Sequence, residues 1–339
     1  MDYREAGVDI TAADAAKARI KALAKATFNP QVMTEIGSFG GMFRPDLSRY
    51  REPVLVASTD GVGTKIKVAI AAHVHDTVGY DLVAHCVNDI LVQGALPLFF
   101  LDYVALGRMD PLKVEKIVAG FSRACAEFGC PLIGGETAEM PGTYAEDDYD
   151  LAGFIVGVVE REKALPRGVA EGDVLVGLPS LGLHTNGYSL ARKVLLDVLG
   201  LGVDQEVEEL GTTVGAALLA PHRSYLAALE PLLERDKIRA LVHITGGGFG
   251  GNIPRVLPEG LGARVRKGAW DVPPLFRLIQ KGGSVPDEEM YRTFNMGIGM
   301  IAVVSPGDLH DVEHSLERRG ETSFVIGSVV AGPGVTLED

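Results

Sequence analysis

The stretch Gly134-Gly135-Glu136-Thr137-Ala138-Glu139-Met140-Pro141-Gly142 follows an apolar run, Cys130 to Ile133, that has the composition of a short buried strand. It contains two carboxylates three residues apart, with a hydroxyl between them. Mg²⁺ binds one or two carboxylates and completes its shell with water and phosphate oxygens. We therefore expect a Gly-Gly turn followed by a loop that helps to bind a metal and a phosphate. The alternative is a polar loop whose acids face water.

Length and composition indicate a globular protein of two domains. The chain has 339 residues, which is long for a single hydrophobic core, and 47% of them are hydrophobic. The 42 glycines gather in loops between apolar runs, where backbone can approach a ligand closely. The net charge of −13 argues against a nucleic-acid or anionic-membrane surface.

Cysteine usage and the absence of targeting signals suggest a cytoplasmic protein. Cys86, Cys125 and Cys130 form no zinc pattern and no disulfide framework, which suits a reducing compartment. Residues 1–5 lack the basic start of a signal peptide. No run approaches the ~18 apolar residues of a membrane span, so we expect no membrane partner.

A second glycine-rich turn lies between a strand and a helix. Val54–Ser58 reads as a buried strand, Thr59-Asp60-Gly61-Val62-Gly63-Thr64-Lys65 follows it, and Ile66–Ala72 is expected to be helical. Such a turn exposes backbone N–H groups that can bind an anion. The order and spacing exclude a Walker A loop. A turn without a ligand would need the glycines, but not Asp60 and Lys65 as well.

The rest of the N-terminal half alternates helices and strands. Apolar spacing predicts helices over 15–26, 78–93 and 111–128, strands over 97–103 and 150–159, and a capping box at Thr11–Asp14. Gly37–Phe43 is too flexible for a helix and suggests a lid. Asn88 and Asp89 lie in the second of these helices, and if they are internal they must be bonded or bind metal.

A charged segment at 160–172, with Pro166 and Gly168, marks the domain boundary, so we predict domains 1–166 and 167–339. The second begins with a strand at 173–178 and a loop that carries His184, whose imidazole titrates near neutral pH and could act as acid or base. A structural role is the alternative. Residues 189–240 look mainly helical.

A third glycine-rich turn, His243–Asn252, follows the predicted strand 240–242 and precedes a short helix. It suits a phosphate, or simply a backbone that needs positive φ. Near the C-terminus, Tyr291–Met300 leads into a buried strand, where Arg292 or Asn295 could contact a ligand or serve a turn.

Read together, these segments resemble phosphoribosylformylglycinamidine cyclo-ligase, or aminoimidazole ribonucleotide synthetase, of purine biosynthesis. The matching stretches are Tyr3–Asp9, Ser58–Lys65, Cys86–Asp89, Gly134–Gly142, His184–Leu190, Thr245–Phe249 and Tyr291–Met300. The Thr-Ala-Glu-Met-Pro-Gly and His-Thr-Asn-Gly-Tyr-Ser-Leu runs are specific to this family among its relatives. The loop at Gly37–Phe39 has Ser38 where many members have Gly or Asp, which leaves its role as a lid open.

The resemblance implies a mixed α/β fold of two α/β domains, with the N-terminal domains pairing across a homodimer into a β-barrel. It implies ATP- and Mg²⁺-dependent ring closure of a phosphoribosyl substrate, with a monovalent cation requirement left open.

The resemblance also assigns site residues, each at its position in this sequence. The nucleotide would lie against Asp60, Gly61, Gly63, Thr64, Lys65, Asn88, Asp89, Gly135 and Thr137. The metal ligands would be Asp60, Asp89, Glu136 and Glu139. The substrate would contact His184, Asn186, Gly246, Gly247 and Gly248, and the catalytic groups would be His184, Asp60, Lys65 and Glu136.

Related families fit less well. Selenophosphate synthetase would have a reactive Cys near the N-terminus, whereas the first here is Cys86; the hydrogenase-maturation relative would end in a cysteine-bearing tail. Thiamine monophosphate kinase should lack the two specific runs, and the glutamine-dependent synthetase of the same pathway is far longer. A non-catalytic nucleotide-binding module would tolerate the loss of acids, and here every candidate acid is present.

Overall fold

The computed structural model describes residues 10–339, so the matching stretch Tyr3–Asp9 lies outside the described residues. The chain divides into two compact units. The first runs to Ile90 and resumes with Leu96–Val158, and the second contains Leu91–Ala95 and Val159–Asp339. The main division therefore falls at Val158, before the expected boundary at 166.

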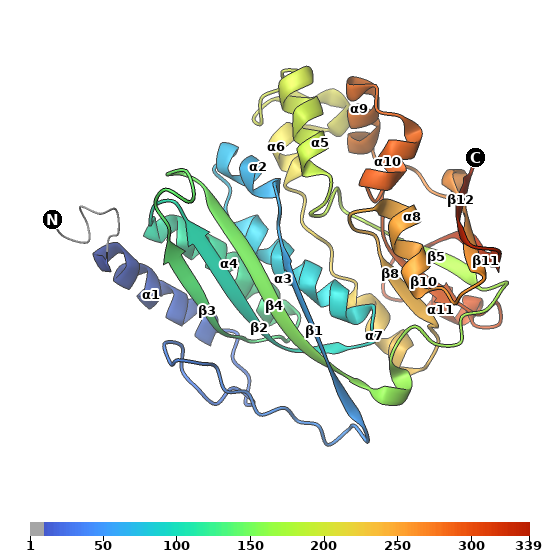
Figure 1. The fold of residues 1–339 in the computed structure, drawn as a ribbon, viewed down its shortest axis with the longest axis horizontal. Helices are drawn as coiled ribbons and strands as arrows, with labels where there is room; N and C mark the ends of the chain where they lie inside the picture. The colour runs from blue at the N-terminus through green and yellow to red at the C-terminus, as the bar shows by residue number, and fades with distance from the viewer. Residues whose placement is uncertain (1–9) are drawn as a thin grey trace. The chain divides into compact units, whose positions relative to one another are not determined.

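The first unit contains a four-stranded sheet with the order β1-β4-β2-β3 (Figure 1). Strand β2 pairs antiparallel with β4 and parallel with β3. The elements are α1 (Ile10–Lys25), β1 (Pro53–Gly61), α2 (Lys65–Ala71), α3 (Asp76–Leu91), β2 (Leu96–Leu106), α4 (Pro111–Glu127), β3 (Leu132–Glu139) and β4 (Tyr149–Glu160).

Helices α3 and α4 pack on one face of this sheet (Figure 1). Phe121 of α4 packs against Phe100 of β2, with ring centroids 6.2 Å apart. The two helices cross closely because glycines stand at the crossing: a Cβ at Gly79 would lie 2.2 Å from the Ile117 carbonyl oxygen. A larger residue there would force the helices apart, since real Cβ atoms do not approach backbone so closely.

The other face of the sheet exposes apolar side chains. Leu55 of β1 is 62% exposed, Phe154 of β4 is 41% exposed and Tyr103 of β2 is 37% exposed. Phe154 and Tyr103 alternate along their strands with buried residues that face the helices, as the period of two requires. We call these three residues the open apolar face.

The second unit is built on a six-stranded mixed sheet with the order β12-β9-β11-β5-β10-β8. All its pairs are antiparallel except β12 with β9. Its strands are β5 (Val174–Pro179), β8 (Ala240–His243), β9 (Leu261–Arg266), β10 (Ile298–Val304), β11 (Phe324–Ala331) and β12 (Gly334–Glu338), with a separate hairpin of β6 (Glu206–Val207) and β7 (Thr212–Thr213).

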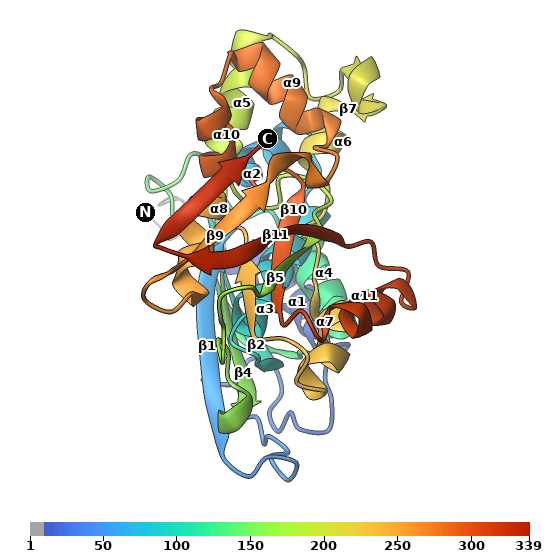
Figure 2. The ribbon, with the colours of Figure 1, turned by 90° about the vertical axis from the view of Figure 1, so that its right-hand side faces the viewer.

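The helices of this unit lie around that sheet (Figure 2). They are α5 (Tyr188–Arg192), α6 (Val214–Leu218), α7 (Leu226–Glu234), α8 (Gly248–Asn252), α9 (Pro274–Gly283), α10 (Asp287–Thr293) and α11 (Leu309–Glu317). Short 3₁₀ or π turns cover Arg161–Lys163, Lys193–Val198, Glu208–Leu210, Ile253–Val256 and Lys267–Ala269. Helices α7 and α11 lie side by side. Among the described residues, no helix is both long and apolar enough to cross a membrane.

Two expectations about local structure need correction. Gly134 to Glu139 does not form a turn and loop, because it continues β3 in parallel register with β2. The helices expected over 189–240 are present, but they are short and are separated by the β6–β7 hairpin, since Gly200, Gly202 and Gly211 interrupt them. The predicted capping box at Thr11–Asp14 lies inside α1, which begins at Ile10.

Candidate active site

Asp60 and Asp89 converge on one histidine in the first unit. The His85 Nε2 atom lies 2.8 Å from Asp60 Oδ2 and 3.5 Å from Asp89 Oδ2. Asp89 Oδ2 also accepts a hydrogen bond from the Ser58 hydroxyl at 3.2 Å. Strand β1 supplies Ser58 and Asp60, and α3 supplies His85 and Asp89 one helical turn apart, so the fold places two predicted ligands together.

Electrostatics favours the charged form of this cluster. Burial opposes a charge on His85, but hydrogen bonds to Asp60 and Asp89 outweigh it and raise the pKa of His85 to about 9. For Asp60, the same histidine overcomes the effect of burial and lowers the pKa of the carboxyl. An imidazolium therefore stands between two carboxylates. His85 was missed from the sequence, although its spacing of four from Asp89 would have placed both on one helix face.

The turn after β1 is shorter than predicted, because Thr59, Asp60 and Gly61 belong to the strand. Strand β1 ends at Gly61, Gly63 has a φ of 60°, and α2 begins at Lys65. The Gly61 N–H donates to Asp60 Oδ1 at 2.6 Å, so this N–H is already engaged by the chain. Thr64 occupies the N-cap position of α2 without a side-chain capping bond. Asn88 is fully buried on α3.

The side chain of Lys65 lies in the core, away from the surface of the turn. Its Nζ is 2.7 Å from Asp81 Oδ2, and both side chains are fully buried. Burial lowers the pKa of Lys65, and the Asp81 carboxylate works against that shift. Because this side chain is fully buried, direct contact between Lys65 and a phosphate would require the side chain or its surroundings to move.

The acids of the opening motif lie along β3. Glu136 is exposed and stands in register with Tyr103. Glu139 Oε1 accepts a hydrogen bond from the Met109 N–H at 2.6 Å. A Cβ at Gly135 would lie 2.1 Å from Asp102 Oδ1, so glycine makes room for that side chain. Burial, reinforced by the Glu136 carboxylate, raises the pKa of Asp102 to about 7. Thr137 is half-buried in the same strand.

Asp60 and Glu136 stand on opposite edges of the sheet. Strands β1 and β3 are its two outer strands, with β4 and β2 between them. Three strand spacings separate their backbones by about 14 Å. Since Mg²⁺–oxygen bonds are only ~2.1 Å long, one ion cannot bind both carboxylates of one chain. Of the four predicted metal ligands, Asp60 and Asp89 come together, because both contact His85.

In the second unit, Asn186 and the third glycine-rich turn are joined. Asn186 Oδ1 accepts a hydrogen bond from the Gly246 N–H at 3.0 Å, and the Gly248 N–H donates to the Thr245 carbonyl at 3.0 Å. Asn252 braces the turn by donating to the Thr245, Gly246 and Gly248 carbonyls. Gly247 and Gly248 both have positive φ, which accounts for two of the glycines by backbone geometry alone.

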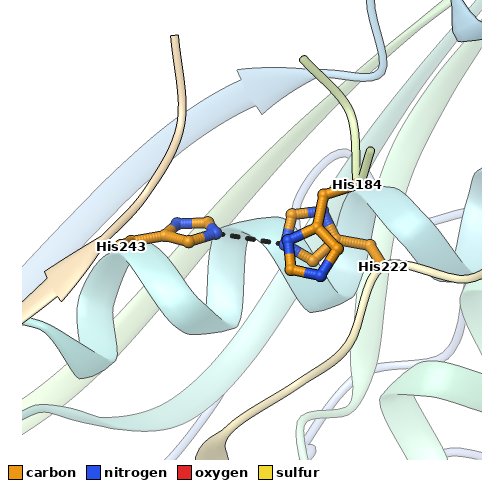
Figure 3. Close-up of side chains that lie close together, drawn as sticks. All are labelled: His184, His222 and His243. Atoms are coloured by element: carbon orange, nitrogen blue, oxygen red, sulfur yellow. Dashed lines mark hydrogen bonds between the residues drawn. The ribbon is translucent and has the colours of Figure 1, made fainter. Parts of the chain in front are cut away.

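His184 lies in a cluster of three histidines (Figure 3). Its ring stacks on that of His222, with centroids 4.0 Å apart, and His222 Nε2 is 3.1 Å from His243 Nε2. All three are buried. His184 has a φ of 62°, in the left-handed region that histidine tolerates better than most residues. His222 and His243 were not predicted, because they lie far apart in the sequence and only the fold brings them together.

Of the two other residues considered as ligand contacts, Asn295 has a structural role. Its Oδ1 accepts hydrogen bonds from the Ser180 hydroxyl and the Gly297 N–H, both at 2.9 Å, and its Nδ2 donates to the Gly182 carbonyl. It is 3% exposed. The other, Arg292, is exposed at the end of α10.

Comparisons with known structures show the fold. A thiamine-monophosphate kinase from Stenotrophomonas maltophilia matches with a TM-score of 0.69 at 18% identity, over 95% of each chain. A hydrogenase maturation protein HypE, solved in complex with ATP, matches with a TM-score of 0.64 at 18% identity, over 91% of this chain and 84% of that one. At such identities the likeness concerns the fold alone.

Comparisons of sequence show the family. Residues 47–159 match the family described as AIR synthase related protein, N-terminal domain, and residues 170–339 match its C-terminal domain. A phosphoribosylformylglycinamidine cyclo-ligase from Brevibacillus brevis is 53% identical, with 97% of this chain and 96% of the relative covered. The relative of the same name from Citrifermentans bemidjiense is also 53% identical, over 97% and 95%. The chain therefore belongs to the phosphoribosylformylglycinamidine cyclo-ligase family.

Proposed function

We propose that this chain catalyses the reaction of its family, the ATP-dependent closure of formylglycinamidine ribonucleotide to aminoimidazole ribonucleotide, with release of ADP and phosphate. The observation that carries the proposal is the 53% identity over nearly the whole length of relatives with that name. The acid cluster at the end of β1 adds local support, because it offers charged oxygens beside a glycine-rich turn.

The reaction requires no covalent bond between the protein and its substrates. An amide oxygen is a poor leaving group, so transfer of the γ-phosphoryl group of ATP to the formyl amide oxygen activates the neighbouring carbon. The amidine nitrogen then attacks that carbon, the ring closes and phosphate leaves. Catalysis of this kind depends mainly on holding the reactants in line and on offsetting charge.

The donor set of the first unit fits a magnesium ion. Asp60 and Asp89 direct carboxylate oxygens to one point, where the His85 imidazolium stands in for a cation. These two residues would bind Mg²⁺, which would offset the negative charge of the phosphates. Asn88 and the turn from Gly61 to Thr64 would position the nucleotide. The roles of Lys65 and of Gly135 and Thr137 stay predictions.

We also propose a homodimer in which the open apolar face is covered by that of a second copy. Leu55, Tyr103 and Phe154 lie on three neighbouring strands of one sheet, and burying them would remove apolar surface from water. Pairing of the two sheets into a barrel would also leave no free strand edges. In such a dimer the β3 edge of one subunit can lie beside the β1 edge of the other, which would bring Glu136 near the partner's Asp60.

In the second unit, the loop from His184 to Asn186 and the turn from Gly246 to Gly248 would contact the phosphoribosyl substrate. The hydrogen bond from Gly246 to Asn186 supports this, because it makes the two predicted substrate loops one assembly. His184 as the proton carrier stays a prediction.

The reaction is tested by measuring ADP release from ATP with and without formylglycinamidine ribonucleotide. We expect release to depend on that substrate and to match the aminoimidazole ribonucleotide formed. ATP binding without turnover would support a non-catalytic nucleotide-binding module instead. Glu136→Gln should abolish turnover and leave the unfolding transition unchanged, and retained turnover would remove Glu136 from the site.

The sharing of the site is tested by mixed dimers. Asp60→Asn and Glu136→Gln chains with different affinity tags are co-expressed, and the heterodimer is purified. If each site takes Asp60 from one subunit and Glu136 from the other, one of two sites is intact and about half of the wild-type activity returns. If both residues come from one subunit, both sites are damaged and the heterodimer stays inactive.

A further inference from the structure

We propose that His184, His222 and His243 form a binding site for a divalent transition metal ion of the Zn²⁺, Co²⁺ or Ni²⁺ class. The three rings come from three separate segments of the second unit: the loop after β5, the loop before α7, and the end of β8 (Figure 3). Each offers one ring nitrogen, and these three nitrogens lie within 4.8 Å of one another. The proposal does not depend on the proposed function.

The distances suit a metal. With metal–nitrogen bonds of 2.0–2.1 Å and tetrahedral angles, two ligand nitrogens lie about 3.3 Å apart. The His222 and His243 Nε2 atoms are 3.1 Å apart. The third nitrogen has to approach by at most about 1.5 Å to match the same spacing. The His184 ring, which stacks on His222 at an interplanar angle of 22°, has to turn about its χ angles so that its nitrogen points at the ion.

Hydrogen bonding also favours coordination by His222 Nε2. The other ring nitrogen of His222, Nδ1, faces the Thr185 hydroxyl at 3.4 Å. A ligand histidine usually uses its second nitrogen to hydrogen-bond a neighbouring group, which fixes the tautomer and the orientation of the ring. With its proton on Nδ1, His222 accepts the hydrogen bond from His243 Nε2 through its own Nε2 lone pair. A metal ion would replace the shared proton of this hydrogen bond.

The three rings are buried, and the surrounding chain leaves space shaped for them. His184 is 1% exposed, His222 is fully buried and His243 is 6% exposed. A Cβ at Gly299 would lie 2.4 Å from His184 Cε1 and 2.2 Å from the Tyr225 hydroxyl, so a glycine makes the space that the His184 ring occupies. Imidazole nitrogens select Zn²⁺, Co²⁺, Ni²⁺ or Cu²⁺ rather than Mg²⁺, which requires oxygen ligands. Three protein ligands leave a fourth position for water.

The chain offers a matched control. His310 and His314 lie one turn apart on the exposed side of α11, with stacked rings 6.3 Å apart. Two exposed histidines one helical turn apart can bind transition metals weakly at the protein surface. All titrations are therefore made in the His310→Gln/His314→Gln background, with protein stripped by EDTA and dialysed.

The first test is a Co²⁺ titration followed by visible absorption, with Zn²⁺ affinity measured by competition against a chromophoric chelator. With Mg²⁺ present to occupy the Asp60–Asp89 site, we expect one Co²⁺ ion per chain, d–d bands typical of tetrahedral Co²⁺, and Zn²⁺ that displaces Co²⁺. His222→Gln should weaken Zn²⁺ binding by more than the roughly 10- to 100-fold that loss of an outer-shell partner costs. Unchanged affinity in this variant, or loss of all binding in the control background, would overturn the proposal.

The second test remains decisive if His222→Gln folds poorly. His222→Cys keeps a metal ligand at the same position, and a thiolate bound to Co²⁺ gives an intense near-ultraviolet charge-transfer band. We expect this band in His222→Cys and none in the His310→Gln/His314→Gln background alone. A folded, Co²⁺-binding His222→Cys chain without the band would show that residue 222 is not a ligand.

Discussion

Replacing Lys65 by Met should strongly destabilise the first unit. The Lys65 ammonium and the Asp81 carboxylate are 2.7 Å apart, and both side chains are fully buried. Removing one partner leaves the other charge buried without its counter-ion, which costs about 3–5 kcal/mol. A loss of 1 kcal/mol lowers Tm by about 2–4 °C in a domain of 150–250 residues, so we expect a fall on the order of 10 °C.

The double variant Lys65→Met/Asp81→Leu separates stability from catalysis. Replacing a buried pair by apolar residues of similar volume is often neutral, so the double variant should recover most of the lost stability. Urea unfolding of the wild type, both single variants and the double variant gives the coupling free energy, which we expect to exceed about 2 kcal/mol. A cost below about 1 kcal/mol for Lys65→Met would refute the reasoning. If the stable double variant turns over ATP normally, Lys65 is not a phosphate ligand.

Three further predictions concern single residues. In magnesium-free buffer, the protonation of His85 should contribute about 3 kcal/mol to the free energy of unfolding, because folding raises its pKa from 6.5 to about 9. This contribution is complete below pH 6.5 and is lost as the pH rises through 9. Urea unfolding of His85→Gln from pH 6 to 9.5 should lack that decline, and equal declines in both proteins would contradict the assignment. Gly299→Ala should cost about 1–3 kcal/mol, because its Cβ would lie 2.2 Å from the Tyr225 hydroxyl; a cost under 0.5 kcal/mol in urea would count against such tight packing. Asp110→Ala should cost about 1 kcal/mol by thermal unfolding and Asp110→Asn much less, because the Asp110 carboxylate caps α4; equal losses would exclude capping as the cause.

Elements with strong local signals were predicted well from the sequence. Helix α4 has Pro111 at its first position and Gly129, with φ of 64°, just after its end, and both boundaries agree with the prediction to within one residue. The strand and the helix around Asp60 were also found, but β1 extends to Gly61 and is mostly exposed rather than buried, because it is an outer strand of the sheet. The pairing of β3 was not, because a short segment rich in glycine gives no periodic signal, and only the neighbouring β2 makes it a strand.

The candidate site was predicted in part. The grouping of Asp60 with Asp89 follows from the sequence, because both belong to motifs of the family. The separation of Asp60 from Glu136 does not, since the order of strands in a sheet is decided by packing rather than by order along the chain. The burial of Lys65 was not predicted either, because its partner, Asp81, lies on a different helix and only the packing of the two helices brings them together.

The segment Leu91–Ala95 has a consequence for dissecting this chain. It belongs to the second unit although it interrupts the first, and within the second unit the Leu165 N–H donates to the Gln93 carbonyl at 3.1 Å. No single cut in the chain therefore separates the two units completely. A fragment that ends at residue 158 would keep residues 91–95, between α3 and β2, without the second unit against which they pack. Modular swaps among family members must exchange this five-residue insert together with the C-terminal half.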